Sequence, residues 1–164
     1  MSRWFLTFLA AFAIAPAAAA QTPAPYTAVE IDPFLPAPHV DFPREYQSAL
    51  VDDIARELSV EFPTLMVLRQ GDRASGEPVL RISGTITEFK PGSRAKQLLI
   101  GFGAGAAVVR AEVSFQDAAG GQTLQERDLS GSTGFTGGDS QGASQSLARR
   151  IAKLCRDARW FDSN

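Results

Sequence analysis

The stretch Leu98–Phe115, "LLIGFGAGAAVVRAEVSF", decides between two folds for this chain. Gly101, Gly103 and Ala106 fit the G-x-G-x-x-G/A loop that binds dinucleotides between a strand and a helix. After the glycines, however, apolar residues occupy every second position, namely Val109, Ala111, Val113 and Phe115. A period of two indicates a strand, whereas phosphate binding needs the N-terminus of a helix at this point. We therefore interpret the glycines as the entrance to a strand and expect no cofactor.

The segments around this stretch also predict strands. "VLRISGTITEF" (Val79–Phe89) alternates apolar and polar residues, which indicates a half-buried strand with one open face. We expect Gly84 to mark a point where a helix approaches closely. Asp117–Gly121 supplies turn residues, so the strand after Val108 and the segment "QTLQERDLSG" that follows the turn form a hairpin. Near the start of the chain, "YTAVEIDPF" predicts a short strand, and its flanking prolines favour a sheet edge.

Two segments have helical periodicity. After Pro43, apolar residues recur every four positions at Tyr46, Leu50, Ile54 and Leu58. The opposite face of this helix, with Asp52, Asp53, Arg56 and Glu57, is expected to be solvated. A second stripe contains Ala143, Leu147, Ile151, Leu154 and Ala158, and Cys155 beside it is expected to be a buried, inert thiol. The rest of this second helix carries basic residues that complement the helix dipole, namely Arg149, Arg150, Lys153, Arg156 and Arg159. A basic docking face formed by these residues is a secondary interpretation.

The N-terminus predicts export. Arg3 precedes an apolar run, and Ala18-Ala19-Ala20 forms an A-x-A cleavage site, as in a secretory signal peptide over residues 1–20. No cysteine stands at the cleavage point, so no lipid anchor is expected and the protein should be periplasmic or secreted. Cleavage would leave one domain with a charge near −3, which gives no electrostatic case for nucleic acid binding.

The order of predicted elements is β-α-β-β-β-β-α. A proline-rich segment with the short strand covers residues 21–42, and the rest of a single domain covers residues 43–164. Antiparallel hairpins with two helices for one face predict an α+β fold. We expect a two-layer α/β sandwich with a mostly antiparallel sheet of about four to five strands.

The chain lacks the usual catalytic constellations. His39 is its single histidine and Cys155 its single cysteine, which leaves a metal site or a histidine-based triad unsupported. The "SRAK" at Ser93–Lys96 has the S-x-x-K spacing of serine acylases but none of their partner motifs. We expect no enzyme, although carboxylates such as Glu30, Asp32 or Glu88 could still be brought together by the fold.

The residues 98–109 carry no charge. They either pack as a strand entrance or form an arm that contacts a partner or the membrane periphery, since their length suits a barrel strand better than a helical span. The candidate interaction segment contains Leu98, Leu99, Ile100, Gly101, Phe102, Gly103 and Gly105. Lys90, Arg94 and Lys96 just before it are candidate basic contacts to an anionic surface.

The pattern Gly84-x-Ile86, the loop from Lys90 to Lys96, Gly101-x-Gly103-x-Gly105 and the Asp117–Gly121 turn resembles a family. It is an uncharacterised family of small Gram-negative envelope proteins, often lipoproteins. More distantly, the order of elements resembles the periplasmic domain of the curli secretion channel. The resemblance implies an α/β sandwich and an envelope location and carries no catalytic residues.

The sequence therefore predicts a non-enzymatic periplasmic or envelope protein that associates with itself or with an unknown envelope protein. The alternative is a small-molecule or lipid carrier with its ligand between the sheet and the helices.

Overall fold

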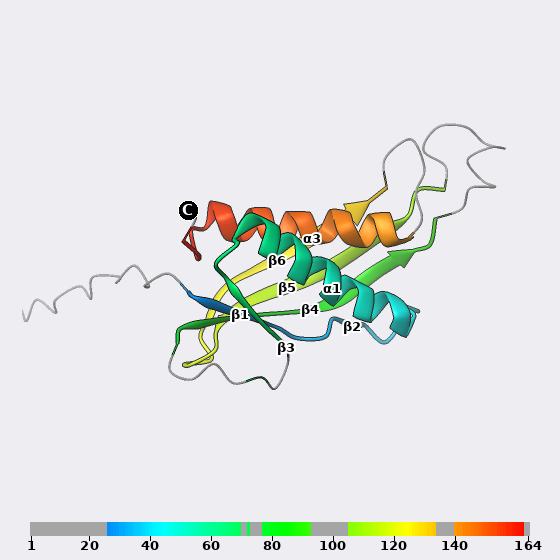
Figure 1. Cartoon of the computed structure of the whole chain (residues 1–164). Helices are drawn as coiled ribbons and strands as arrows, with labels where there is room; N and C mark the ends of the chain where they lie inside the picture. The colour runs from blue at the N-terminus through cyan, green and yellow to red at the C-terminus, as the bar shows by residue number, and fades with distance from the viewer. Residues whose placement is uncertain (1–25, 70–71, 73–76, 93–104, 134–139, 163–164) are drawn as a thin grey trace, which may run out of the picture.

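The computed structural model describes residues 26–69, 72, 77–92, 105–133 and 140–162. Its elements follow the order β1 (Ala28–Ile31), β2 (Leu35–Pro36), α1 (Arg44–Glu61), β3 (Met66–Arg69), β4 (Val79–Lys90), β5 (Val108–Asp117), β6 (Thr123–Ser132) and α3 (Ser140–Asp157). Figure 1 shows both helices on one face of a twisted sheet. The predicted two-layer α+β sandwich and its element order are confirmed.

The sheet has the order β3-β1-β4-β5-β6, with β2 paired to β4. The two long ladders, β4–β5 and β5–β6, are antiparallel, whereas β1 pairs in parallel with both β3 and β4. The expected edge position of the first strand is wrong, because β1 lies between two strands and is buried along its whole length. The flanking prolines lie outside its four residues, so they remove no hydrogen-bond donor from the ladder.

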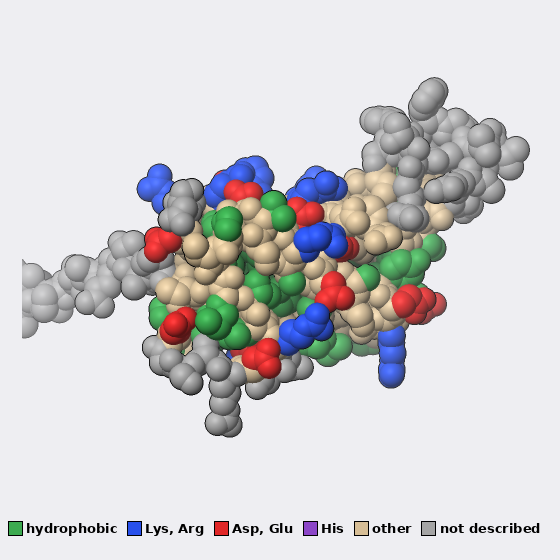
Figure 2. All heavy atoms as spheres, viewed as in Figure 1, with side chains coloured by type: hydrophobic (Ala, Val, Ile, Leu, Met, Phe, Trp, Pro, Cys, Tyr) green, Lys and Arg blue, Asp and Glu red, His purple; other side chains and the backbone are tan. Residues whose placement is uncertain are grey.

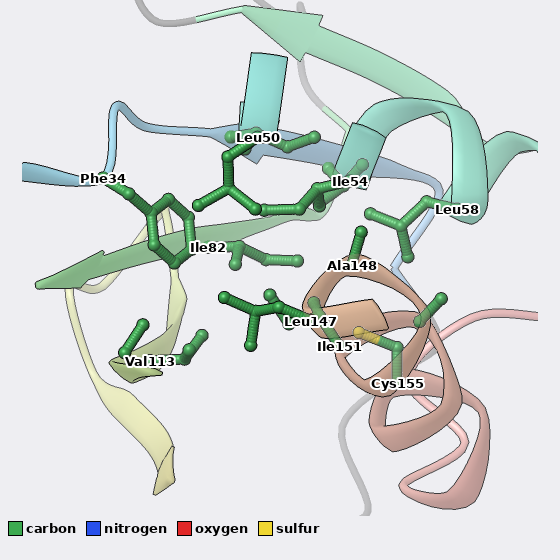
Figure 3. Packing of buried hydrophobic residues seen from close by; sticks show 14 of the residues in the cluster. Phe34, Leu50, Ile54, Leu58, Ile82, Val113, Leu147, Ala148, Ile151 and Cys155 are labelled. Atoms are coloured by element: carbon green, nitrogen blue, oxygen red, sulfur yellow. The ribbon is translucent and has the colours of Figure 1, made fainter. Parts of the chain in front are cut away.

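The core lies between the sheet and the helices. Alternate residues of β4 and β5 point into it, as the period of two predicts, and the stripes of α1 and α3 meet them there. Figure 3 shows Ile82 and Val113 from the sheet facing Leu50, Ile54, Leu147 and Ile151 from the helices. Cys155 is buried in the same layer, and this burial raises the pKa of its thiol, in agreement with the inert thiol predicted above.

Two glycines mark close approaches within this layer. A Cβ atom on Gly131 of β6 would lie 2.1 Å from the Ala143 carbonyl oxygen and 2.4 Å from the Leu147 nitrogen, so α3 crosses β6 almost backbone to backbone. A Cβ atom on Gly84 would lie 2.4 Å from a ring carbon of Phe34. The expectation of a helix over Gly84 is therefore wrong, because the ring of Phe34 fills that space.

The helices run side by side in the same direction. Arg156 near the end of α3 binds the Glu61 carboxylate at the end of α1, with 2.7 Å between Nη1 and Oε1. On α3, small side chains recur every four residues on the buried surface, namely Ser140, Ser144, Ala148 and Ala152. Figure 3 shows Ala148 of α3 next to Leu58 of α1. Small residues at this spacing let the two helices approach closely.

This close approach corrects the expected solvation of Asp53, which is only 3% exposed. Asp53 lies two turns before Glu61 on the same row of α1, and that row borders α3. Its Oδ1 binds Arg56, and its Oδ2 has no hydrogen-bond partner within the described residues.

The two ends of the described chain meet. The Tyr26 nitrogen donates to the Trp160 carbonyl at 2.7 Å, and Tyr26 and Phe161 form a parallel bridge. The predicted hairpin turn is also confirmed, since Asp117 accepts from Gly120 and Gly121 has φ of 65°. Neither helix in the described part of the chain combines the length and hydropathy needed to cross a membrane.

Candidate interaction surfaces

The candidate interaction segment lies almost entirely outside the described residues. Of its members only Gly105 is described, with φ of 96°, which is a conformation that favours glycine. Arg94 and Lys96 also lie outside the described residues. Lys90 ends β4 and pairs with Val108 at the start of β5, so the chain leaves and re-enters the sheet at one point (Figure 1).

Lys90 is exposed and binds the Glu88 carboxylate, which also lies 3.6 Å from Nε of Arg110. The hydrogen bond from Lys90 is the main cause that lowers the pKa of Glu88. Lys90 is therefore partly neutralised by a neighbour on its own strand. The contact of Lys90 with an anionic surface stays a prediction.

The face of the sheet away from the helices is uncovered by any described element and is polar. Side chains from β4 and β5 alternate onto it, as the sequence predicts, and Thr85 lies opposite Glu112 while Ser83 lies opposite Ser114. A hollow of about 870 Å³ opens on this face. Its lining includes hydroxyl groups at the floor, the exposed side chain of Leu35 and carboxylates around it.

Four carboxylates surround this hollow, and we call them the acidic face: Asp32, Glu112, Glu126 and Asp128. Register brings them together, because Glu112 pairs with Asp128 and the next polar row pairs Ser114 with Glu126. Within the described residues Glu112, Glu126 and Asp128 take part in no ion pair. Arg127 also lines the hollow, so four carboxylates and one guanidinium group leave its lining with an excess of negative charge.

An ion-paired arginine borders the acidic face. Nη2 and Nε of Arg81 lie 2.9 and 3.0 Å from Oε2 of Glu30, and Nε lies 3.9 Å from Oδ2 of Asp32. Burial is the main cause that raises the pKa of Asp32, and Glu30 adds to this while Arg81 opposes it. The fold therefore brings together two of the three carboxylates considered for an enzyme.

The third carboxylate is distant from them. Glu88 lies seven residues after Arg81 on β4, or about 23 Å at ~3.3 Å per residue. Moreover, the described residues contain no cluster of three or more His, Cys, Asp or Glu side chains that could hold a metal ion. The fold therefore places Glu30 and Asp32 together and leaves Glu88 apart from them.

The outward surface of α3 is basic, and we call its exposed cations the basic face: Arg149, Arg150, Lys153 and Arg156. They lie opposite the buried stripe of the helix, over an arc of about 120° at ~100° per residue. Lys153 binds Asp157 at 2.7 Å, whereas Arg149 and Arg150 take part in no ion pair with another described residue. Figure 2 shows blue side chains gathered along the upper edge of the molecule, where Figure 1 places α3.

Sequence reasoning found the open face and the basic residues but missed the acidic face. Glu112 belongs to one strand and Glu126 and Asp128 to the next, and only the exact register of the hairpin makes them neighbours. Counting residues outward from the Asp117–Gly121 turn would place Glu112 opposite Arg127, because the register shifts by one residue between Phe115 and Gln116, so the sequence carried no signal for this pairing.

These features define a small α+β sandwich domain with helices on one face and a charged, uncovered sheet on the other. The chain belongs to the family described as domain of unknown function DUF4410, whose model matches residues 36–137. The expected membership of an uncharacterised family is confirmed. The family match does not show that the G-x-G-x-G segment characterises the family. Nor does it show the distant resemblance to the curli channel. No curated protein matches the chain significantly.

Three solved structures illustrate the likeness of fold. The hypothetical protein CT253 from Chlamydia trachomatis is 14% identical, with 82% of this chain and 97% of that chain covered and a TM-score of 0.55. A PelC variant dodecamer from Paraburkholderia phytofirmans is 16% identical, with 84% and 91% covered and a TM-score of 0.51. Protein XCC0632 from Xanthomonas campestris is 10% identical, with 79% and 83% covered and a TM-score of 0.51. At these identities the likeness shows the fold alone.

Proposed function

We propose that this chain is an exported, non-catalytic protein of the cell envelope that works by associating with copies of itself. The observation that carries this proposal is the uncovered sheet face, which presents unneutralised carboxylates around a hollow of about 870 Å³. The signal-peptide pattern of residues 1–20 supports export. The PelC dodecamer supports assembly, because it shows a related fold in a multi-copy complex.

The charge distribution favours protein association over catalysis. In the part of the chain that the structure describes, the carboxylates of the hollow face hydroxyl groups and have neither histidine nor cysteine beside them. Burial raises the pKa of Asp32, but general acid–base catalysis would also need a second group of complementary protonation state beside it. A protein surface of opposite charge needs no such group, since exposed carboxylates already meet its requirement.

The alternative, a carrier with its ligand between the sheet and the helices, has less support. That layer is filled by side chains that are fully buried, including Phe34, Leu50, Ile82, Leu147 and Ile151. A ligand there would have to displace close-packed side chains.

The proposal is tested by expressing the full chain in a Gram-negative host, separating the envelope fractions and measuring the mass of the purified protein by mass photometry. We expect the protein in the periplasmic or membrane fraction, with residues 1–20 removed, and a particle mass of several chains. A chain that lacks residues 1–20 is the matched control and should stay in the cytoplasm. A strict monomer at micromolar concentration, with no crosslinked species in the intact envelope, would overturn the proposal.

A further inference from the structure

We propose that copies of this chain associate head to tail, with the acidic face of one copy docked on the basic face of the next. This inference rests on the proposed function and names the two surfaces that would carry it.

The two faces have opposite charges and exposed ionic groups. The acidic face contributes Glu112, Glu126 and Asp128, and the basic face contributes Arg149 and Arg150, all of them without an ion pair among the described residues. Unpaired charges of opposite sign attract each other and steer two surfaces toward association. The described chain thus holds both halves of a complementary pair of surfaces.

A single chain cannot bring its own two faces together. The acidic face lies on the side of the sheet away from the helices, whereas the basic face lies on the outward side of α3, with the sheet and the core between them. Figure 1 shows this order of layers. Any contact between the two faces must therefore form between different copies.

The acidic face also offers an apolar anchor. Leu35 lines the hollow and is 60% exposed, so its side chain is available to pack against another surface. Exposed ion pairs alone contribute only about 0–1 kcal/mol each, so a stable contact needs apolar burial as well. We therefore expect Leu35 to lie against the partner copy, with the charged groups setting the orientation.

A contact between two different surfaces has a defined consequence for assembly. Each copy would use its acidic face once and its basic face once, so association is heterologous and gives a closed ring or an open filament instead of a simple symmetric dimer. The expected product is therefore an assembly of more than two copies.

The test uses charge reversal in the full chain. Glu112→Lys with Asp128→Lys reverses the acidic face, and Arg149→Glu with Arg150→Glu reverses the basic face. Each variant should weaken self-association by about 10-fold or more, because attraction becomes repulsion. Asp41→Lys with Asp162→Lys changes the charge by the same amount as the first variant, at exposed positions outside both faces, and should associate as the wild type does.

Mixing gives the decisive measurement. Among the groups that take part in no ion pair within the described residues, the first variant changes the summed charge of the acidic face from −3 to +1, and the second changes that of the basic face from +2 to −2. An equimolar mixture should therefore restore the large assembly by mass photometry in 50 mM salt. The assembly should also weaken in 500 mM salt, where the Debye length falls to about 4 Å. Circular dichroism melting checks that each variant is folded, since exposed substitutions usually change stability by less than about 0.5 kcal/mol.

The outcomes separate this inference from the proposed function. If the wild type assembles and neither variant weakens the assembly, the paired faces are wrong and self-association stands. If the folded variants lose assembly but their mixture does not regain it, head-to-tail pairing is wrong. A monomeric wild type overturns both the inference and the proposed function.

Discussion

The crossing of α3 over β6 at Gly131 gives a sharp test of the fold. An alanine Cβ at this position would lie 2.1 Å from the Ala143 carbonyl oxygen, whereas real Cβ contacts keep at least 3.0 Å. The helix would have to move by about 0.9 Å, and both atoms it meets first belong to the backbone, which cannot rotate away. Inserting a methyl group into a packed layer costs about 1–3 kcal/mol, and we expect the upper end here.

Gly131→Ala should therefore lower the melting temperature by about 10 °C in a chain of this size. The assay is circular dichroism melting of the purified protein at one fixed concentration, because self-association makes the melting temperature depend on concentration. Gly120→Ala is the matched control, since its Cβ would meet only the flexible carboxylate of Asp117, at 3.1 Å. The control should change stability by less than about 0.5 kcal/mol. If Gly131→Ala melts within 2 °C of the control, the backbone contact of α3 with β6 is refuted.

Three further results are expected. Leu147→Ala should lower the free energy of unfolding by about 2–5 kcal/mol in urea titrations, because Leu147 is fully buried; a smaller loss would contradict this packing. Cys155 should resist iodoacetamide at pH 8 until the protein unfolds, as followed by intact mass, since burial raises the pKa of its thiol; rapid native labelling would argue against that burial. The pKa of Asp32 is raised above 3.8 in the folded protein, so the folded state holds the carboxyl proton more tightly than the unfolded state does. The stability that this proton contributes to the folded state is therefore lost as the pH rises. Asp32→Asn should therefore be more stable than the wild type at pH 7 and equal to it below about pH 3.8, and an equal gain at both values would refute this assignment.

The sequence predicted the elements that depend on local periodicity. The alternation of Val109 to Phe115 predicted β5, and the four-residue spacing of Leu50 and Ile54 predicted α1. These patterns predict the elements correctly because one face of each element packs against the core, so the spacing of apolar residues follows the period of the helix or strand.

Features that depend on distant contacts could not be predicted. Asp53 has the local sequence of a solvated residue, and its burial depends on how α1 packs in the folded domain. Likewise, the interior position of β1 depends on β3, which reaches it after the whole of α1. The candidate interaction segment from Leu98 stays a prediction, while the acidic face depends on a register across two strands.

The meeting of the two ends of the described chain, at Tyr26 and Phe161, has a consequence for how the domain can be rebuilt. Because Tyr26 and Phe161 are bridged, a short peptide could join residue 162 to residue 26 with little distortion. New termini could then be opened at the exposed turn at Gly120, whose backbone nitrogen donates to the nearby Asp117 carboxylate. Such a circular permutant would keep every pairing of the sheet while moving the point of attachment of any leader or fusion partner to a different loop. Because these ends are adjacent, the attachment point of the domain could be changed without changing its fold.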